Sequence, residues 1–158
     1  MSAEQLPDIA PWYRSPVFEE FLGSLLGELR LPNAPEAVGR ARRFLRSVAA
    51  AWGVSHVTET AELCVSEVAT NAYQHTDRDE ERPLRLVVLR VGACIRCEVH
   101  DQSPEVPCIR DAGMLAESGR GMFILDVLTY QHGVYRTDNG KAVWFELEAW
   151  PNDEEGRS

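Results

Sequence analysis

The sequence predicts an α+β domain: a two-layer α/β sandwich in which helices cover one face of a mixed sheet. Two observations lead to this prediction. Segments whose apolar residues recur at helical spacing are separated by short runs in which apolar and polar residues alternate. The chain also has 158 residues, 44% of them hydrophobic and 26% charged, which is enough for one domain with a hydrophobic core.

The overall charge and hydropathy exclude two classes of partner. Sixteen basic residues against 25 acidic ones leave a net charge of −9, so no surface for a phosphate backbone is indicated and nucleic acid is not expected as a partner. The apolar runs are too short to span a bilayer, and no signal peptide opens the chain. We therefore expect a cytoplasmic protein that does not bind membranes.

The chain divides into three expected regions. Residues 1–20 are rich in proline and lack periodicity, which is typical of an N-terminal arm. Residues 21–150 form the folded domain. Residues 151–158 are an acidic tail that we expect to be disordered.

The first folded elements are a strand and a helix. Leu25–Leu31 reads as a strand, and Asn33 followed three residues later by Glu36 indicates a helix N-cap. Trp52-Gly53 is expected to end this helix. Its apolar residues at helical spacing are Val38, Ala41, Leu45, Val48 and Trp52.

A second helix is expected from Thr58 to about His75, with two neighbouring stripes. The apolar stripe predicts the face that packs on the core: Ala61, Val65, Val68 and Ala72. The stripe beside it carries the polar pair of the helix: Thr60, Cys64, Glu67 and Asn71.

Two strands follow, over Leu84–Val91 and Cys94–Asp101, joined by a tight turn at Gly92-Ala93. In the second strand apolar and polar residues alternate, and Asp101 falls on the apolar side. Because burying an unpaired carboxylate is costly, we expect Asp101 to have a specific partner.

Cys94 and Cys97 form a C-x-x-C motif within this strand. An offset of three residues places the two thiols on opposite faces of a strand, so they cannot easily bind one metal ion. Small residues filling the sheet are favoured over zinc or redox chemistry. The four cysteines of the chain are expected to be free thiols.

The last third of the domain predicts a lid, a helix and a hairpin. Ser103–Ser118 contains two prolines and reads as a long mobile segment. Gly119–Tyr130 is an apolar helix. The strands Val134–Thr137 and Lys141–Ala149 flank Asp138-Asn-Gly140, a strong hairpin turn signal.

Three short motifs in fixed order carry the chemistry. Glu67-Val-Ala-Thr-Asn71 places a carboxylate and an amide one helical turn apart, Val99-His-Asp-Gln-Ser103 places Asp101 at a strand end, and Ser118-Gly-Arg-Gly-Met122 opens a helix with two glycines. An amide oxygen suits Mg²⁺, a fixed carboxylate suits an adenine amine, and a glycine-rich helix start suits anionic oxygens. Together the motifs predict a pocket for a magnesium–nucleotide complex.

Residues 25–149, with these motifs in this order, resemble the Bergerat-fold ATPases, the superfamily of gyrase, sensor histidine kinases and anti-sigma kinases. The chain length and the ending Gly140-Lys-Ala-Val-Trp-Phe-Glu-Leu147 look most like the stand-alone anti-sigma factor serine/threonine kinases of bacteria. The resemblance implies the Bergerat ATP-binding fold, with ATP and Mg²⁺ as cofactors.

The resemblance also assigns roles. Asn71 would bind Mg²⁺, Glu67 would act as the base and Asp101 would bind the adenine amine. Two positions depart from the family pattern: the last position of its Asp-x-Gly motif is Ser103, and the last-strand position that often carries Thr is read as Ala142. The other residues expected at the nucleotide are Ser103, Gly119, Arg120 and Gly121.

The expected function is that of an ATP-dependent serine/threonine kinase that phosphorylates an anti-sigma factor antagonist, binds a sigma factor and regulates transcription by partner switching. A homodimer is left open. The alternative is a protein-binding module gated by ATP or ADP that transfers no phosphate. Both need Asn71 and Asp101, and Glu67 favours the kinase because a binding module has no chemical need of a base. A histidine-kinase fragment is disfavoured, since no dimerisation helix with a phosphoacceptor histidine precedes the domain.

Overall fold

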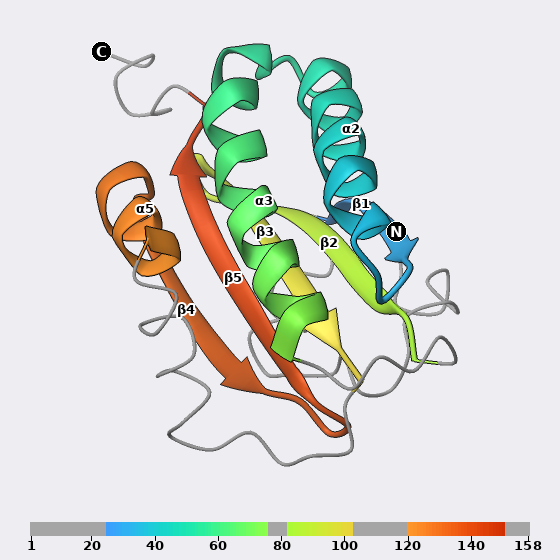
Figure 1. The fold of residues 1–158 in the computed structure, drawn as a ribbon. Coiled ribbons are helices and arrows are strands. Elements are labelled where there is room, and N and C mark those ends of the chain that lie inside the picture. Colours follow the sequence, from blue (N-terminus) through green and yellow to red (C-terminus); the bar gives the residue numbers. More distant parts are fainter. Residues whose placement is uncertain (1–24, 76–81, 103–119, 151–158) are drawn as a thin grey trace, which may run out of the picture.

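A computed structural model describes residues 25–75, 82–102 and 120–150 of the chain. These residues form one sheet with its helices on one face (Figure 1). The elements, in chain order, are β1 (Leu25–Leu31), α2 (Glu36–Ala51), the short 3₁₀ helix η4 (Ser55–Val57), α3 (Thr58–His75), β2 (Leu84–Val91), β3 (Cys94–Asp101), α5 (Arg120–Leu128), β4 (Gln131–Arg136) and β5 (Lys141–Glu148).

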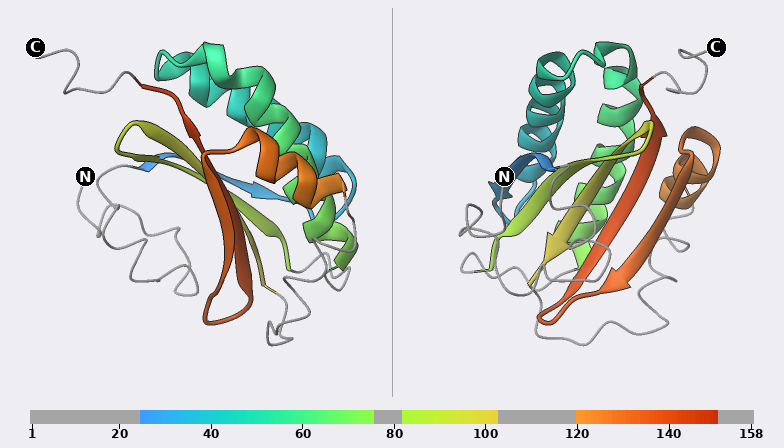
Figure 2. Two further views of the ribbon diagram at one scale, coloured as in Figure 1. Left: turned by 90° about the vertical axis from the view of Figure 1, so that its left-hand side faces the viewer. Right: turned by 180° about the vertical axis from the view of Figure 1, so that it is seen from behind.

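The sheet has five strands in the order β1-β2-β3-β5-β4. Figure 2 shows α2, α3 and α5 on the same side of it. The predicted α+β class and the two-layer arrangement are therefore confirmed. The sheet is not mixed as expected, because every neighbouring pair of its strands is antiparallel.

The connections explain the antiparallel sheet. Two helices, α2 and α3, run in opposite directions between β1 and β2, so the chain re-enters the sheet at the end it left and β2 reverses β1 (Figure 1). A single helix, α5, precedes β4, which consequently runs in the same direction as β3. However, β5 folds back between these two strands and pairs with both. No parallel neighbours result among the described strands.

Helix α2 begins later than the cap signal predicted. The N-cap is Pro35, with no side-chain cap hydrogen bond, and Asn33 is buried instead of capping the helix. The helix ends at Trp52 and Gly53 as predicted, and Gly53 has a φ of +73°, a conformation that favours glycine. The residues that α2 buries are Ala37, Ala41, Leu45, Val48 and Ala49.

The buried face of α2 therefore differs from the predicted one at both ends of the helix. Ala37 and Ala49 lie on the buried stripe, whereas Val38 is only partly buried and Trp52 is 48% exposed. From Ala37 onward the buried residues follow one another at intervals of four, four, three and one residues, which places them on one face of the helix.

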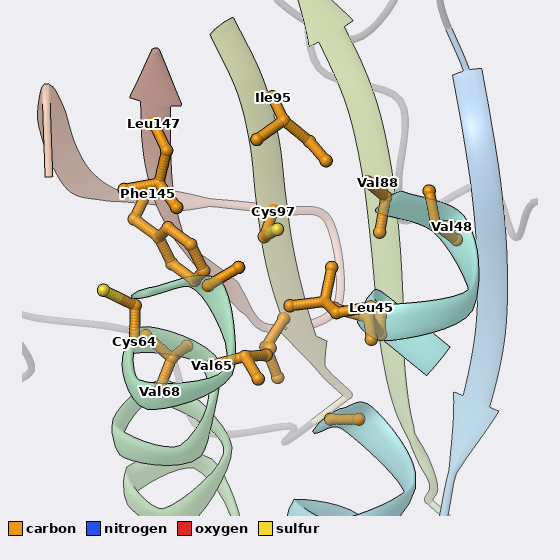
Figure 3. Packing of buried hydrophobic residues seen from close by; sticks show 14 of the residues in the cluster. Leu45, Val48, Cys64, Val65, Val68, Val88, Ile95, Cys97, Phe145 and Leu147 are labelled. Carbon is orange, nitrogen blue, oxygen red and sulfur yellow. The ribbon is translucent and has the colours of Figure 1, made fainter. Parts of the chain in front are cut away.

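Helix α3 and its core face agree with the prediction. Its four predicted core residues are each at most 7% exposed. Figure 3 shows Cys64, Val65 and Val68 of α3 and Leu45 of α2 directed toward the sheet. The strand residues that meet them there are Val88, Ile95, Cys97, Phe145 and Leu147.

The two hairpins follow the predicted turns. β2 and β3 pair around Gly92, which has a φ of +60°. β4 and β5 pair around the turn before Lys141, but β4 begins at Gln131, earlier than expected. There the Tyr130 N–H donates to the Glu146 carbonyl at 2.8 Å, so pairing starts as soon as α5 ends.

Candidate functional site

Two of the predicted site residues, Asn71 and Asp101, lie at one end of the sandwich. β3 ends there at Asp101, α3 ends there four residues after Asn71, and the β4–β5 turn lies beside them (Figure 1). At the opposite end, a cavity of about 410 Å³ is lined by Thr60 of α3, by Leu128 at the end of α5 and by Thr129 and Tyr130 after it. Since α5 finishes near the first turn of α3, it begins toward the far half of α3, where Asn71 lies.

Asn71 is held by its own helix. Its side-chain Nδ2 donates to the Glu67 carbonyl oxygen at 3.0 Å, and the residue is only 8% exposed. In the described part of the chain this is the one hydrogen bond of the side chain, so its amide oxygen is left for a ligand. An amide oxygen is a ligand that Mg²⁺ accepts, and the role of Asn71 at an ion stays a prediction.

Glu67 lies one turn before Asn71 on the stripe next to the core face. It is partly buried and close enough to Cys64 to influence that thiol. Burial, and secondarily the Glu67 charge, raise the pKa of Cys64 to about 12. The glutamate therefore lies between the core and the exposed side of the helix, and its role as a base stays a prediction.

Asp101 has the specific partner that its burial requires. The residue is 2% exposed, and the Lys141 ammonium lies 3.0 Å from its Oδ2. Gly140 packs against the Asp101 backbone carbonyl, and a Cβ added there would stand 2.7 Å from Oδ1. The turn before β5 thus both supports and neutralises the carboxylate.

The strand register corrects the sequence-based choice of Ala142. Asp101 pairs with Lys141, whereas Ala142 pairs with His100 on the face of the sheet turned away from the helices. Lys141 is the residue of β5 that reaches the site. The signal was present in the sequence, because Val143, Phe145 and Leu147 were expected to share one face and Lys141 belongs to the same alternation.

The third motif is only partly described. Ser103 and Gly119 lie outside the described residues, as does the predicted segment 103–118. Arg120 and Gly121 belong to the first described turn of α5, so the predicted helix is present over Arg120–Leu128. The role of these four residues at a nucleotide stays a prediction.

Behind Asp101, the other face of β3 carries a buried polar cluster of Arg96, Glu98, His100, Tyr135 and Glu146. Glu98 accepts hydrogen bonds from Arg96 Nε at 2.6 Å, Tyr135 OH at 2.6 Å and His100 Nε2 at 2.9 Å. Arg96 Nη1 also donates to Glu146 at 3.0 Å. The cluster joins β3, β4 and β5 directly behind the site.

The pKa values of two members of the cluster, Glu98 and His100, are both lowered, but for different reasons. Burial alone would raise the pKa of Glu98, but the hydrogen bonds and charges of His100 and Arg96, with Tyr135, lower it to about 2. Burial lowers the pKa of His100 against the opposing effect of Glu98. Glu98 is therefore ionised at neutral pH, whereas the pKa of His100 lies below its ordinary value.

The cysteines occupy the places that the strand pattern predicted. Cys97 faces the helices and belongs to the hydrophobic core, whereas Cys94 lies three residues earlier on the opposite face of β3. Cys64, Cys94 and Cys97 are buried free thiols. In the ranges that the structure describes, no group of three histidine, cysteine or acidic residues is arranged to hold a metal ion.

None of the described helices is long and apolar enough to cross a membrane.

The fold and the three motifs define an ATPase domain. The histidine kinase-like ATPase domain family matches residues 31–147, and the chain belongs to this family. The resemblance to the Bergerat-fold ATPases is thereby confirmed. The chain is also similar to the serine-protein kinase RsbW of Bacillus velezensis, with 29% identity over 116 residues that cover 64% of this chain and 72% of that protein.

Proposed function

We propose that this protein is an ATP-dependent serine/threonine kinase that phosphorylates an anti-sigma factor antagonist. One observation carries the proposal. Asn71 presents a free amide oxygen one helical turn after Glu67, at the same end of the sandwich as the buried carboxylate of Asp101. Asn71 would be the metal ligand, Glu67 the proton acceptor and Asp101 the group that recognises adenine. Phosphoryl transfer from ATP needs groups that position the nucleotide, the metal ion and the attacking hydroxyl.

Each residue would perform one task in the transfer. Asp101 would fix the purine by accepting a hydrogen bond from its amine, and Asn71 would hold Mg²⁺ through its amide oxygen. Mg²⁺, when bound, would neutralise charge on the phosphates. Glu67 would take the proton of the attacking hydroxyl, and the backbone N–H groups that open α5 would face the anionic oxygens.

The partner is inferred from the family. The similar protein is a serine-protein kinase, which supports a protein hydroxyl as the acceptor. The motifs and chain length resemble the anti-sigma kinases, so we infer an antagonist protein as substrate and a sigma factor as a second partner. In this reading the protein acts in the cytoplasm and regulates transcription by exchanging partners.

Calorimetric titration tests the nucleotide site. We expect MgATP and MgADP to bind the wild type, and Asp101→Asn to weaken both, because both carry adenine. Asn71→Ala should chiefly remove the Mg²⁺ dependence. Absence of heat with millimolar ATP and excess Mg²⁺ would contradict the proposal.

The kinase step is tested by Glu67→Gln with labelled ATP and the antagonist. ATP affinity should stay nearly constant, whereas phosphate transfer should fall by about 10²–10⁴-fold, the usual effect of losing a general base. Glu59→Gln, an exposed glutamate in the first turn of the same helix, is the matched control. A wild type that binds ATP and the antagonist together without labelling it would instead be the nucleotide-gated binding module.

A further inference from the structure

Position 141 differs from every other basic position of the chain because it carries a lysine. The chain has sixteen lysines and arginines, of which fifteen are arginines and one, Lys141, is a lysine. This single lysine lies in the candidate site, paired with Asp101. A planar guanidinium would satisfy a carboxylate through a bidentate pair, whereas an ammonium is a compact donor whose three hydrogens point in different directions.

The geometry leaves part of the ammonium available. The Lys141 side chain is 12% exposed and that of Asp101 is 3% exposed. The ion pair with Asp101 Oδ2 is the one interaction of Lys141 with the described residues. An ammonium carries three N–H donors and one carboxylate oxygen needs at most one of them, so at least two are left for water or a ligand next to a buried carboxylate.

The pair presents an acceptor and a donor side by side. Nζ and Oδ2 are 3.0 Å apart, and both groups lie on the helix-facing side of the sheet at the end of β3. The edge of a 6-aminopurine carries the complementary pattern, because its amine donates and the adjacent ring nitrogen N1 accepts. A site built from Asp101 alone would recognise only the amine.

We propose that Lys141 is a specificity-determining residue that donates a hydrogen bond to N1 of the purine whose amine binds Asp101. This inference rests on the proposed ATP site and adds a direct contact to it. The position of the ion pair indicates that Lys141 contacts the adenine ring and not the phosphates. Its partner is Asp101, the carboxylate assigned to adenine, whereas the metal is assigned to the helical turn of Glu67 and Asn71.

The single lysine provides a direct test by amine acylation. Labelling of the Lys141 peptide with an N-hydroxysuccinimide ester is followed by mass spectrometry, with the chain's α-amine as internal reference. MgATP, MgADP and adenosine at saturation should each protect Lys141, whereas inorganic tripolyphosphate should not. Protection by tripolyphosphate equal to that by ATP would place the ammonium at the phosphates and overturn the proposal.

A second test distinguishes a direct hydrogen bond from Lys141 to N1 from a purely structural role of the lysine. Binding of ATP is compared with that of 1-deaza-ATP, in which a carbon replaces N1, for the wild type and Lys141→Met. The wild type should prefer ATP by about 10- to 100-fold, the range for a hydrogen bond to a charged group. Lys141→Met should lose this preference. A merely structural lysine would leave the preference intact while weakening both ligands equally.

The matched control is Arg42→Met, which removes an exposed cation on α2 and should keep the preference for ATP. The two proposals fail in different ways. If the wild type gives no heat with MgATP, the proposed function fails. If ATP binds but Lys141 is neither protected nor needed for the N1 preference, the nucleotide site stands and the lysine contact is wrong.

Discussion

The environment of the Asp101 carboxylate is set by two neighbouring residues and by its own place in β3. Lys141 compensates its charge, Gly140 gives it room, and its place at the end of the apolar alternation of β3 buries it. The sequence predicted the burial and the need for a partner, because the alternation was regular. It did not predict which residue is the partner, since that depends on the register between two strands that are forty residues apart.

The residue-scale prediction concerns Gly140. A Cβ there would clash with the Asp101 backbone carbonyl and stand 2.7 Å from Oδ1, so Gly140→Ala must displace the end of β3. We expect a loss of about 1–3 kcal/mol in unfolding free energy, typical of overpacking, and weakened ATP binding. Urea unfolding and calorimetry measure the two effects.

The control for this substitution is Gly39→Ala in α2. An added Cβ at Gly39 meets only the end of the Arg43 side chain at 3.4 Å, and alanine is the better helix former. This variant should gain up to about 1 kcal/mol and bind ATP normally. If both variants behaved alike, the close contact of Gly140 with Asp101 would have no energetic role.

At the scale of elements, β3 has two buried faces with different chemistry. One face packs apolar side chains against the helices, and the other holds the polar cluster around Glu98. Alternation predicted which residues share a face but not that the polar face is buried, because a pattern of polar residues is equally typical of a solvated face. The hydrogen bonds from β4 and β5 make the burial possible.

The cluster predicts a pH dependence of stability. The pKa of Glu98 is about 2 in the folded state against 4.5 in the unfolded state, so the unfolded chain binds more protons between these values and stability falls as pH drops through this window. The lowered pKa of His100 acts in the same sense and begins to lower stability below pH 6.5.

Glu98→Gln tests this account by urea unfolding at several pH values. At pH 7 the variant should be about 3–5 kcal/mol less stable than wild type, because the buried Arg96 loses a charged partner. The difference should shrink between pH 5 and pH 3 as the wild-type carboxylate loses its advantage. Glu59→Gln, an exposed change, should show no such convergence. A constant difference across this range would contradict the assigned role of Glu98.

At the scale of the whole molecule, one core connects the site to the rest of the fold. α3 contributes Val65 and Val68 to that core on one stripe and carries Glu67 and Asn71 on the next, so the positions of these two candidate site residues depend on how the helix packs on the sheet. The helical and strand periodicities were enough to predict this layering. The antiparallel order of all described strands was not predictable in the same way, because it follows from how the connections return the chain to the sheet.

The shared core predicts that the buried thiols report on nucleotide binding. Cys64 and Cys97 lie in the core, and burial raises the pKa of both thiols, that of Cys64 to about 12. At pH 8 they should react with a thiol reagent only when the domain opens. MgATP binds only the folded state in the proposed function, so it should slow their labelling by the factor 1 + [ATP]/Kd, about 100-fold at 100 times Kd.

Peptide mass spectrometry after timed labelling measures each cysteine separately. Cys94, on the other face of β3 next to the β2–β3 turn, serves as a reference for local opening, and burial raises its pKa to about 11. Equal slowing of Cys64 and Cys97 by MgATP is expected if site and core open as one unit. If these two thiols label at the same rate with and without saturating MgATP, the openings that expose them leave the nucleotide bound, and the site and the core are separate folding units.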